Sequence, residues 1–444
     1  MTIYALSSGP GISGVAVIRI SGKETSRILK LLTKKDLPKP RVATIKKIID
    51  PNNLELIDEG IILWFPGPKS YTGEDMAELH VHGSKAVIYA IHKALGDTKK
   101  CRIAEPGEFT KRAFQNGKIN LLKAESISDL ISSETEIQRK QAINIMTGRS
   151  SEVYNNMREK LLKALSNIEA KIDFPDEDLP VKVINEIQSI SSKIKSEIKK
   201  VLNDKKVGEI IREGFKIAIL GPPNAGKSSL LNYLSRRDAA IVSEVAGTTR
   251  DVIEVHLNID GYPVVLSDTA GIRESKDEIE KKGINLALKK AENADLNLVV
   301  IEPKKAYFTG FLKGLVSSDK TLVVVNKSDL GIENMLEDFS QYNPIYISII
   351  KEKNIDTLIS TIRNKLKNKF LSNQNILITR ERHRLHLEQC LTHLENFENK
   401  RDEQDFDKAA EDLRLAAREL GKIVGKFDVE EILGSIFNDF CIGK

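Results

Sequence analysis

The sequence predicts a multidomain α/β protein in which a doubly wound sheet is inserted in an all-α helical domain and preceded by an α+β domain. Short β-rich runs predict the first domain, and a helical spacing of apolar residues predicts the second. Regular alternation of β-rich runs with helical stretches predicts the inserted sheet. The chain has 444 residues, enough for about three domains of ordinary size. The expected segments are 1–118, 119–212, 213–369 and 370–444.

The first segment has the pattern of an α+β domain. Residues 14–21, 60–65 and 76–83 are short β-rich runs bounded by Gly, Pro and Asn. We expect each of these runs to form a strand.

Helical patterns flank the inserted segment on both sides. Before it, one apolar stripe recurs at spacings of three and four: Ile187, Ile190, Ile194, Ile198 and Val201. The prolines of residues 173–180 break this helical region. After the insertion the helical spacing returns, with Leu387, Leu391, Leu394, Phe397, Leu413, Leu420, Ile423 and Val424. We expect the two stretches to pack into one discontinuous domain, because each alone leaves an apolar face unburied.

The inserted segment alternates apolar runs with helical stretches. The runs are FKIAILG, YPVVLSDTAG, LNLVVIE, TLVVVNKSD and PIYISI. This alternation is typical of a doubly wound sheet with helices on both faces.

Composition bounds the class of protein. Hydrophobic residues make up 41% and charged residues 30%, which allows real cores and a solvated surface. The net charge of +5 is compatible with RNA contact but does not argue for it, because an electrostatic footprint depends on clustering. The three cysteines are widely spaced, so a disulfide framework is not expected. No apolar run approaches the length of a membrane span and no signal pattern opens the chain, so we expect a cytoplasmic protein.

The stretch GPPNAGKSS, residues 221–229, follows a β-rich run and precedes a helical one. This is the context that the phosphate-loop motif G-x-x-x-x-G-K-[ST] requires. Gly221 and Gly226 allow the backbone to wrap phosphates, and N–H groups at a helix N-terminus attract an anion. Lys227 is expected to reach the β- and γ-phosphates, and Ser228 to ligate Mg²⁺.

Two further motifs follow apolar runs of the inserted segment. Asp268 of DTAG is expected to hold Mg²⁺ through water, with the Gly271 N–H near the γ-phosphate. In NKSD, the acceptor-only carboxylate of Asp329 suits the two N–H donors on the edge of guanine. Asn326 would help to hold the base, and Lys327 would lie across it. The order of the three motifs predicts a P-loop GTPase fold that binds GTP.

The loop expected near the base departs from the usual pattern. Ser348 stands where a Ser-Ala pair is expected, and Ile349 replaces the alanine. A backbone N–H can still face the guanine here.

The residue after DTAG raises the question of what positions the attacking water. In Ras-type GTPases it is a glutamine, whereas here it is Ile272, which can neither donate nor accept a hydrogen bond. The stretch SEVAGTTRD, residues 243–251, stands where the first switch belongs. Thr249, rather than Thr248, is expected to complete the Mg²⁺ shell. Arg250 is either an arginine finger or a structural salt-bridge partner.

GPPNAGKSS, AGTTRD, DTAGIRE, NKSD and the terminal FCIGK together resemble the MnmE (TrmE) family of tRNA-modification GTPases. The resemblance spans the chain, since RISG and FPGPKSYTGED fit the N-terminal domain of that family. It implies activation by nucleotide-dependent dimerisation of the G domains, with K⁺ in place of an arginine finger. A cation between the β- and γ-phosphates neutralises developing charge, as a guanidinium does.

The resemblance also implies roles for single residues. Asn224 matches the K⁺ ligand of the phosphate loop, and Ser243, Val245 and Thr248 match the residues around the ion. Glu280 matches the glutamate that positions the water and would be catalytic together with Lys227, although a solvated helix-face carboxylate is the ordinary role of such a residue. The other residues expected at the nucleotide are Ala225, Gly226, Ser229, Glu244, Ala246, Gly247, Thr269 and Ala270.

By the same resemblance, the N-terminal domain is similar to the folate domains of aminomethyltransferases and mediates constitutive dimerisation. It implies a 5,10-methylene- or 5-formyl-tetrahydrofolate site formed by Arg19, Glu78, Lys118 and Lys444. A glutamate can accept from the N–H edge of a pterin, and basic side chains can pair with glutamyl carboxylates. Each of these four residues also fits an ordinary surface charge.

Cys441 lies in the terminal FCIGK stretch. Its thiol is either a catalytic nucleophile or redox group, or a small hydrophobe packed beside Phe437 and Phe440.

The family resemblance implies a homodimeric, K⁺-stimulated GTPase that forms a heterotetramer with an MnmG-like flavoprotein. It would use tetrahydrofolate to install an aminomethyl or carboxymethylaminomethyl group at C5 of the tRNA wobble uridine. GTP hydrolysis would act as a conformational clock that the helical domain transmits. The alternative is a regulatory RNA- or ribosome-associated GTPase without modification chemistry. A membrane-remodelling GTPase is disfavoured by the lack of a lipid-facing amphipathic helix.

Overall fold

The computed structural model divides the chain into two compact units, each of which is considered by itself. Unit 1 joins Met1–Ser128, Ile145–Ile187 and Asn396–Lys444, and unit 2 joins Asp129–Asn144 and Gln188–Glu395. The structure describes residues 1–9, 11–173, 181–237, 254–268, 287–303, 314–316, 318–331, 340–370, 376–400, 406–427, 433, 436–437 and 440–444. The predicted multidomain α/β class is confirmed, and the bounds of the four predicted segments stay a prediction.

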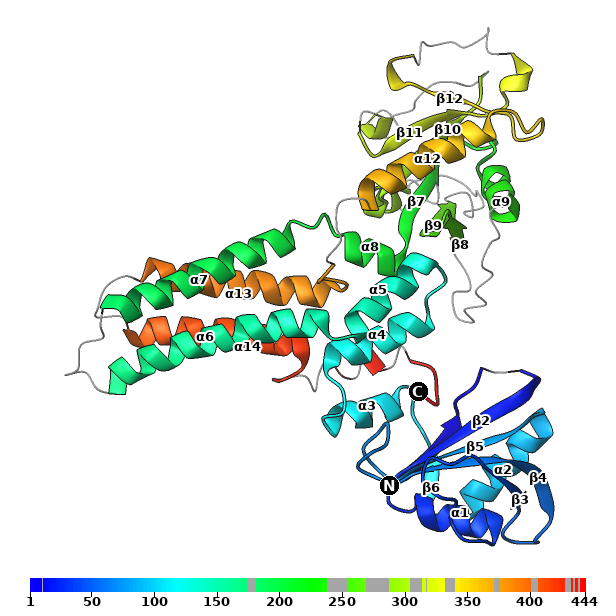
Figure 1. The fold of residues 1–444 in the computed structure, drawn as a ribbon. Coiled ribbons are helices and arrows are strands. Elements are labelled where there is room, and N and C mark those ends of the chain that lie inside the picture. Colours follow the sequence, from blue (N-terminus) through cyan, green and yellow to red (C-terminus); the bar gives the residue numbers. More distant parts are fainter. Residues whose placement is uncertain are drawn as a thin grey trace, which may run out of the picture. The chain divides into compact units, whose positions relative to one another are not determined.

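Unit 1 contains a six-stranded sheet in the order β3-β4-β5-β2-β1-β6 (Figure 1). Its strands are β1 Thr2–Leu6, β2 Ser13–Ser21, β3 Thr44–Ile49, β4 Leu56–Phe65, β5 Met76–Gly83 and β6 Cys101–Ile103. The three predicted strands are confirmed as β2, β4 and β5. The prediction missed β1, β3 and β6. All neighbouring strands are antiparallel except β1 and β6, which are parallel.

Side-chain alternation along β2 assigns the two faces of this sheet. The bordering helices are α1 Thr25–Thr33, α2 Lys85–Asp97 and α3 Glu108–Gln115. Ile18 and Ile20 of β2 share one core with buried residues of α1 and α2. Arg19, between them, lies on the opposite face, where its guanidinium is 5.6 Å from the ring centroid of Phe109 in α3.

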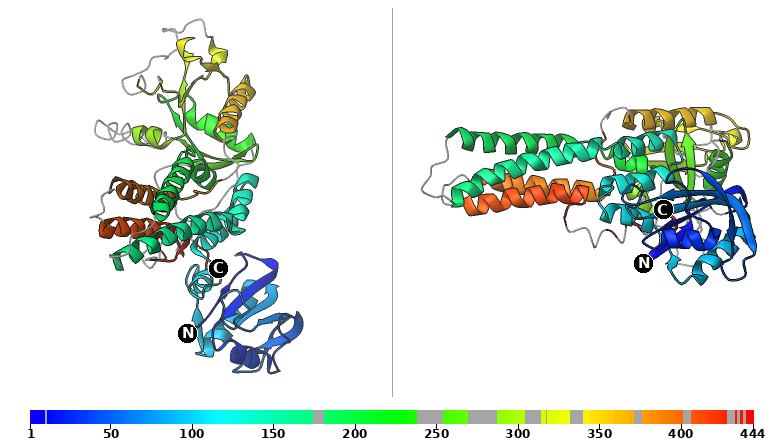
Figure 2. Two further views of the ribbon diagram at one scale, coloured as in Figure 1. Left: turned by 60° about the vertical axis from the view of Figure 1, so that its left-hand side comes forward. Right: turned by 60° about the horizontal axis from the view of Figure 1, so that its bottom comes forward.

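Helices from both sides of the inserted segment pack together in unit 1. The helices are α4 Leu121–Ile131, α6 Arg149–Asp173 and α14 Phe406–Val424. α6 and α14 lie side by side along their length (Figures 1 and 2). α4 contributes Leu121 and Ala124 to a core shared with Phe437 and Phe440 near the end of the chain.

Unit 2 contains a second six-stranded sheet in the order β12-β11-β10-β7-β9-β8. Its strands are β7 Phe215–Leu220, β8 Glu254–Ile259, β9 Tyr262–Asp268, β10 Leu296–Ile301, β11 Thr321–Val325 and β12 Ile345–Tyr346. All five predicted runs are confirmed as parallel neighbours. β8 was not predicted, and it pairs antiparallel with β9 at the edge of the sheet.

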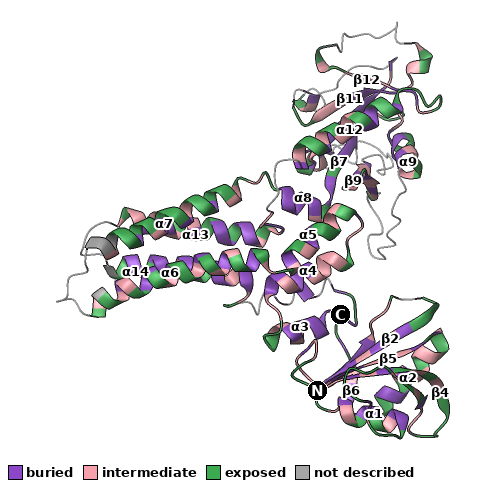
Figure 3. Ribbon diagram, viewed as in Figure 1, coloured by how far each residue is buried: buried purple, intermediate pink, exposed green. Residues whose placement is uncertain are grey.

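Helices cover both faces of this sheet, as the prediction requires. α8 Val207–Glu213, α9 Lys227–Arg237 and α12 Ile355–Phe370 share one core with Ile217 and Ile219 of β7. Ala218 and Leu220 of the same strand belong to a second core on the other face, together with Ala291. The central strand β7 is therefore buried on both sides (Figure 3).

Three further helices with defined bounds are α5 Glu136–Met146, α7 Val181–Leu202 and α13 Glu381–Asn399. α7 carries the predicted apolar stripe, in which Ile187, Ile194 and Ile198 are buried. The described part of α6 ends at Asp173 and that of α7 begins at Val181, so the predicted break between them stays a prediction. Residues 174–180 lie outside the described residues.

Arg384 of α13 joins separate elements of unit 2 through buried charge. Its Nε and Nη2 donate to the two carboxylate oxygens of Glu209 in α8, at 3.0 and 2.8 Å. Nη2 also donates to Asp204 Oδ1 at 2.7 Å, and Nη1 donates to the carbonyl of Leu202 at 3.0 Å. The hydrogen bonds to Glu209 raise the pKa of Arg384 above its usual range. This arginine holds α8 immediately before β7 begins.

We expect Arg384→Ala to lower stability by about 3–5 kcal/mol, because it leaves two nearly buried carboxylates without a counter-charge. The matched control is Arg414→Ala, which breaks exposed ion pairs to Glu169 and Glu411. This variant should lower the free energy of unfolding by less than about 1 kcal/mol. Thermal unfolding followed by fluorescence measures both variants. Equal shifts in Tm for the two variants would contradict a structural role for Arg384.

Candidate functional site

The parallel strands of unit 2 bring three sequence motifs to one edge of the sheet. β7 lies between β9 and β10, with Ile219 opposite Asp268 and Leu220 opposite Val299. β11 continues the same direction beside β10. The carboxyl ends of β7, β9 and β11 therefore lie along one edge, where ligands of open α/β sheets bind.

The phosphate loop needs glycine at two of its positions. Gly221 has φ +140°, and a Cβ there would lie 2.0 Å from the carbonyl oxygen of Val300. Gly226 has φ +96°, and a Cβ there would lie 2.2 Å from Nδ2 of Asn326. Asn224 adopts a left-handed conformation at φ 63° and is exposed. The loop is thus wrapped closely against the strand edge, with the backbone curvature that a polyphosphate requires.

Two polar side chains at the start of α9 meet this loop. Lys227 Nζ donates to the carbonyl oxygens of Gly221 and Pro222, both at 2.9 Å. Burial lowers the pKa of Lys227, and the negative charge of Asp268 opposes that shift. Ser228 Oγ donates to Asp268 Oδ2 at 2.7 Å. The predicted set of Lys227, Ser228 and Asp268 is therefore brought together.

The expected base-binding residues are tied to the phosphate loop. Asn326 Nδ2 donates to the carbonyl of Ala225 at 2.9 Å, and Asn326 is buried. Lys327 Nζ donates to the carbonyl of Asn224 at 2.7 Å and to Glu302 Oε2 at 2.5 Å. Sequence reasoning missed Glu302. Its position directly after β10, at the edge where the motifs lie, is the signal that could have identified it.

Asp329 and Ser348 also lie together. Ser348 Oγ donates to Asp329 Oδ1 at 2.5 Å, and this hydrogen bond holds the pKa of Asp329 below its usual value. The Ile349 N–H donates to Asn326 Oδ1 at 3.4 Å, so the isoleucine in place of alanine does not displace the loop from the base-binding residues. Ser348 itself is buried, whereas Asp329 is exposed.

Part of the predicted nucleotide site lies outside the described residues and stays a prediction. This part comprises Ser243, Glu244, Val245, Ala246, Gly247, Thr248, Thr249, Thr269, Ala270, Gly271 and Glu280. Of the described residues, Ala225 is buried beneath the loop, and Ser229 is exposed on α9.

The four residues predicted to bind folate fall in unit 1. Arg19 of β2 lies opposite Glu78 of β5, and its Nε and Nη2 donate to Glu78 Oε1 at 3.1 and 2.9 Å. His80 Nε2 lies 3.4 Å from Glu78 Oε2. The Arg19 guanidinium lies 5.6 Å from the centroid of the Tyr71 ring as well as from that of Phe109. Tyr71 is a candidate site residue that sequence reasoning missed, and the alternation of β5 places His80 on the same face as Glu78.

The end of the chain completes this face of unit 1. The Phe109 N–H donates to the carbonyl oxygen of Lys444 at 3.1 Å, and Ser7 Oγ donates to that of Gly443 at 2.8 Å. Phe109 thus contacts Arg19 through its ring and Lys444 through its backbone N–H. Lys118 is exposed, and its side chain passes beside Gly73.

Cys441 is exposed. The interpretation of this thiol as a packed hydrophobe beside Phe437 and Phe440 is therefore wrong, although those two rings do contact each other at 5.5 Å between centroids. An exposed thiol remains chemically accessible.

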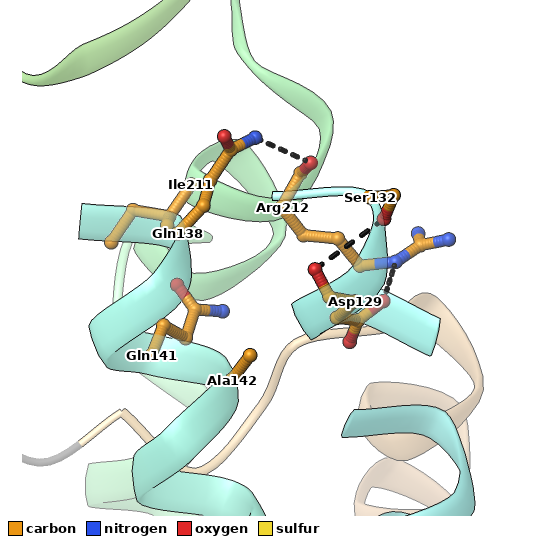
Figure 4. Close-up of a pocket in the computed structure, with 7 residues that line it drawn as sticks. All are labelled: Asp129, Ser132, Gln138, Gln141, Ala142, Ile211 and Arg212. Atoms are coloured by element: carbon orange, nitrogen blue, oxygen red, sulfur yellow. Dashed lines mark hydrogen bonds and ion pairs between the residues drawn. The ribbon is translucent and has the colours of Figure 1, made fainter. Parts of the chain in front are cut away.

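A small polar cavity lies in the helical part of unit 2, lined by Asp129, Ser132, Gln138, Gln141, Ala142, Ile211 and Arg212 (Figure 4). Arg212 Nε lies 3.1 Å from Asp129 Oδ1, and Gln138 Nε2 donates to the carbonyl of Arg212 at 3.3 Å. The cavity volume of about 20 Å³ suits one water molecule and excludes a nucleotide or a pterin. This cavity is therefore not the substrate site.

Within the described ranges, no group of three or more His, Cys, Asp and Glu residues is arranged to hold a metal ion. Every helix described also falls short of the length and apolar character that a membrane span requires.

Comparisons with known proteins agree with the geometry. Residues 2–118 match the family described as the GTP-binding protein TrmE N-terminus, and residues 121–441 match the MnmE helical domain. The tRNA modification GTPase MnmE of Pelagibacter ubique (strain HTCC1062) is 67% identical over 444 residues, which cover 100% of both chains. MnmE of Rickettsia akari (strain Hartford) is 46% identical over 449 residues, and MnmE of Rickettsia bellii (strain RML369-C) is 45% identical over 447 residues, again with 100% of both chains covered.

Among solved structures, Aquifex aeolicus Era bound to GDP and AlF4⁻ is 28% identical and covers 42% of this chain and 68% of that one. Its TM-score of 0.27 adds nothing to the assignment. Full-length identity to the curated relatives, together with both family matches, shows that the chain belongs to the MnmE family of tRNA modification GTPases.

Proposed function

We propose that this protein is a K⁺-stimulated GTPase, activated by dimerisation, that modifies the wobble uridine of tRNA together with an MnmG-like flavoprotein. The observation that carries the proposal is the meeting of Lys227, the Ser228–Asp268 pair and the Asp329–Ser348 pair along one strand edge. These residues supply a cation for phosphates, oxygen donors for a metal and an acceptor for guanine.

Lys227 is the residue that would stabilise the β- and γ-phosphates. Among the described residues, its ammonium donates hydrogen bonds to neutral carbonyl oxygens of its own loop, both at 2.9 Å. Exchange of those carbonyls for phosphate oxygens replaces neutral hydrogen bonds with charge-assisted ones, which are about twice as strong. Asp329 would select guanine, since adenine would leave its carboxylate without donors.

The Ser228 hydroxyl and the Asp268 carboxylate fit Mg²⁺. They converge at 2.7 Å, and hard oxygen atoms are the donors that this ion prefers. When bound, Mg²⁺ would neutralise charge on the β- and γ-phosphates. The hydrogen bond between Ser228 and Asp268 keeps both oxygen donors at the position where the ion would bind.

Asn224 fits the monovalent cation. Its side chain is exposed at the mouth of the phosphate loop and forms no hydrogen bond to any described residue, while its backbone is fixed through the Lys327 contact. An amide oxygen there is free to ligate K⁺, which would supply the positive charge that Arg-finger GTPases take from a guanidinium. Ser243, Val245, Thr248 and Glu280 complete this part of the proposal from the family pattern alone.

The face of unit 1 around Glu78 fits tetrahydrofolate. One carboxylate oxygen of Glu78 is held by Arg19, and the other contacts only His80 at 3.4 Å among the described residues. An oriented carboxylate with a free acceptor position suits the N–H edge of a pterin. Arg19 is engaged with Glu78, so Lys118 and Lys444 are the residues we assign to the glutamyl carboxylates. Cys441 is exposed close to this face and is available as a reactive thiol.

Hydrolysis would time the modification. G domains that pair in the GTP state and separate afterwards would change the arrangement around the tRNA, which couples nucleotide chemistry to uridine chemistry.

We expect Asp329→Asn to lower GTP affinity by about 100-fold, because an amide N–H replaces an oxygen that accepts from guanine. The same change should permit binding of xanthosine triphosphate, whose edge offers an acceptor. Titration with fluorescent nucleotides measures both affinities, and exposed Asp319→Asn is the matched control. Unchanged GTP affinity in Asp329→Asn would remove this residue from the base site.

Potassium dependence tests the cation mechanism. We expect GTP hydrolysis to be faster in KCl than in NaCl. Asn224→Ala should lower the KCl rate by roughly 10- to 100-fold with little change in GDP affinity, because charge stabilisation in the transition state is lost. Asn203→Ala, an exposed asparagine outside the loop, is the control. Equal slow rates of the unmodified protein in both salts would exclude the mechanism.

Folate binding separates modification chemistry from a purely regulatory role. We expect 5-formyl-tetrahydrofolate to bind the unmodified protein, and Glu78→Gln to weaken binding by about 10-fold or more, because a charge-assisted hydrogen bond is lost. Exposed Glu59→Gln is the control, and calorimetry measures the affinity. An unmodified protein that binds no folate would favour the regulatory RNA- or ribosome-associated GTPase instead.

A further inference from the structure

A short stretch of unit 1 carries more positive charge than the whole chain. Residues 23–47 contain nine lysines and arginines against two acidic residues, a net charge of +7, whereas the entire protein has +5. The mild overall basicity therefore conceals one strongly basic segment, which spans α1, the following loop and most of β3.

The charges of this segment gather on one side of α1. Arg27 and Lys30 are three residues apart on α1 and share one of its faces, and Lys23 and Lys34 flank the helix just before its N-cap and at its C-cap. All four are exposed. The apolar residues of α1 lie on the opposite side, in the core beneath the sheet. We call these four residues, with exposed Lys35 and Lys39 of the loop, the α1 basic surface.

Carboxylates do not neutralise this surface. Among the described residues, Lys23, Lys30, Lys34, Lys35 and Lys39 form no ion pair, and Arg27 reaches Glu24 only at 3.8 Å with both side chains well exposed. An exposed pair of that kind contributes little. Lys46 of β3 donates its Nζ to the backbone carbonyl of Asp36, which brings one more cation to the loop side.

We propose that the α1 basic surface binds the phosphate backbone of folded RNA, and that under the proposed function this RNA is the tRNA substrate. Helix α1 has nine residues and is about 13.5 Å long, and the flanking lysines extend this length, so the surface can reach more than one phosphate. Lysine is a point charge suited to phosphate rather than to base edges, so the contact is independent of sequence. Each neutralised phosphate releases condensed counterions and strengthens binding.

Two features distinguish folded RNA from other polyanions. Residues 23–47 contain no aromatic side chain, so the surface offers no platform on which unpaired bases could stack. The apolar residues Ile28, Leu29 and Leu32 of α1 are buried, so the helix presents no apolar face to insert into a lipid surface. The chemistry that remains is a set of exposed lysine and arginine cations, which suits the regularly spaced phosphates of a folded RNA.

The test uses the full-length triple variant Lys23→Ala, Arg27→Ala, Lys30→Ala. Its binding to transcribed tRNA is measured by fluorescence anisotropy at several sodium chloride concentrations. We expect affinity to fall about 10-fold or more, and the slope of log K against log salt to become shallower by about 2. The control variant Lys85→Ala, Lys93→Ala, Lys193→Ala removes the same charge from exposed positions elsewhere and should change affinity less than twofold.

Further measurements separate this surface from the proposed function. Arg27→Lys, which keeps the charge, should bind tRNA as the unmodified protein does, and the triple variant should retain its GTPase rate and thermal unfolding. If the triple variant and the control variant lost equal tRNA affinity, the effect would come from net charge alone, and the proposal would be overturned. Unchanged tRNA binding in the triple variant would overturn the surface and leave the proposed function standing, whereas an unmodified protein that binds no tRNA would overturn both.

Discussion

The parallel placement of β7 between β9 and β10 is the constraint on which the nucleotide site depends. Because the three strands run in one direction, the segments that follow them emerge at one edge, although they are separated widely in sequence. The hydrogen bond from Asn326 to the carbonyl of Ala225 joins residues 101 positions apart. Gly221 and Gly226 permit this close approach, because any side chain there would collide with Val300 or Asn326. Backbone geometry, rather than any single polar contact, assembles the site.

The two candidate sites are built on different principles, and this difference decides how visible each is in the sequence. The nucleotide site lies in contiguous motifs, whose spacing reflects the reach of one loop around phosphates. The site in unit 1 rests on a cross-strand pair, Arg19 and Glu78, and on two hydrogen bonds to the end of the chain, from the Phe109 N–H of α3 to Lys444 and from the Ser7 hydroxyl to Gly443. Such long-range contacts leave no local pattern, so only a resemblance to a family could indicate them.

The same distinction explains what sequence reasoning missed in the fold. β2, β4 and β5 were predictable because each is an uninterrupted β-rich run, as were the five parallel strands of unit 2. β6 has three residues and exists because β1 lies beside it in parallel. β8 is an edge strand whose partner β9 dictates its conformation. Glu302 became apparent only with the structure, because its role depends on which strand ends lie next to it. The α1 basic surface also required the structure, because it depends on which side of the helix is buried.

Unit 1 contains both Met1 and Lys444, whereas unit 2 is complete at Glu395. During synthesis, the ribosome delivers every residue of the GTPase sheet before it delivers α14 and the terminal FCIGK stretch. The sheet of unit 1 lies wholly within the first 103 residues and can form early, whereas α6 waits for α14, and Phe109 of α3 waits for Lys444. Helix α6 is therefore synthesised long before α14, the helix that packs along it.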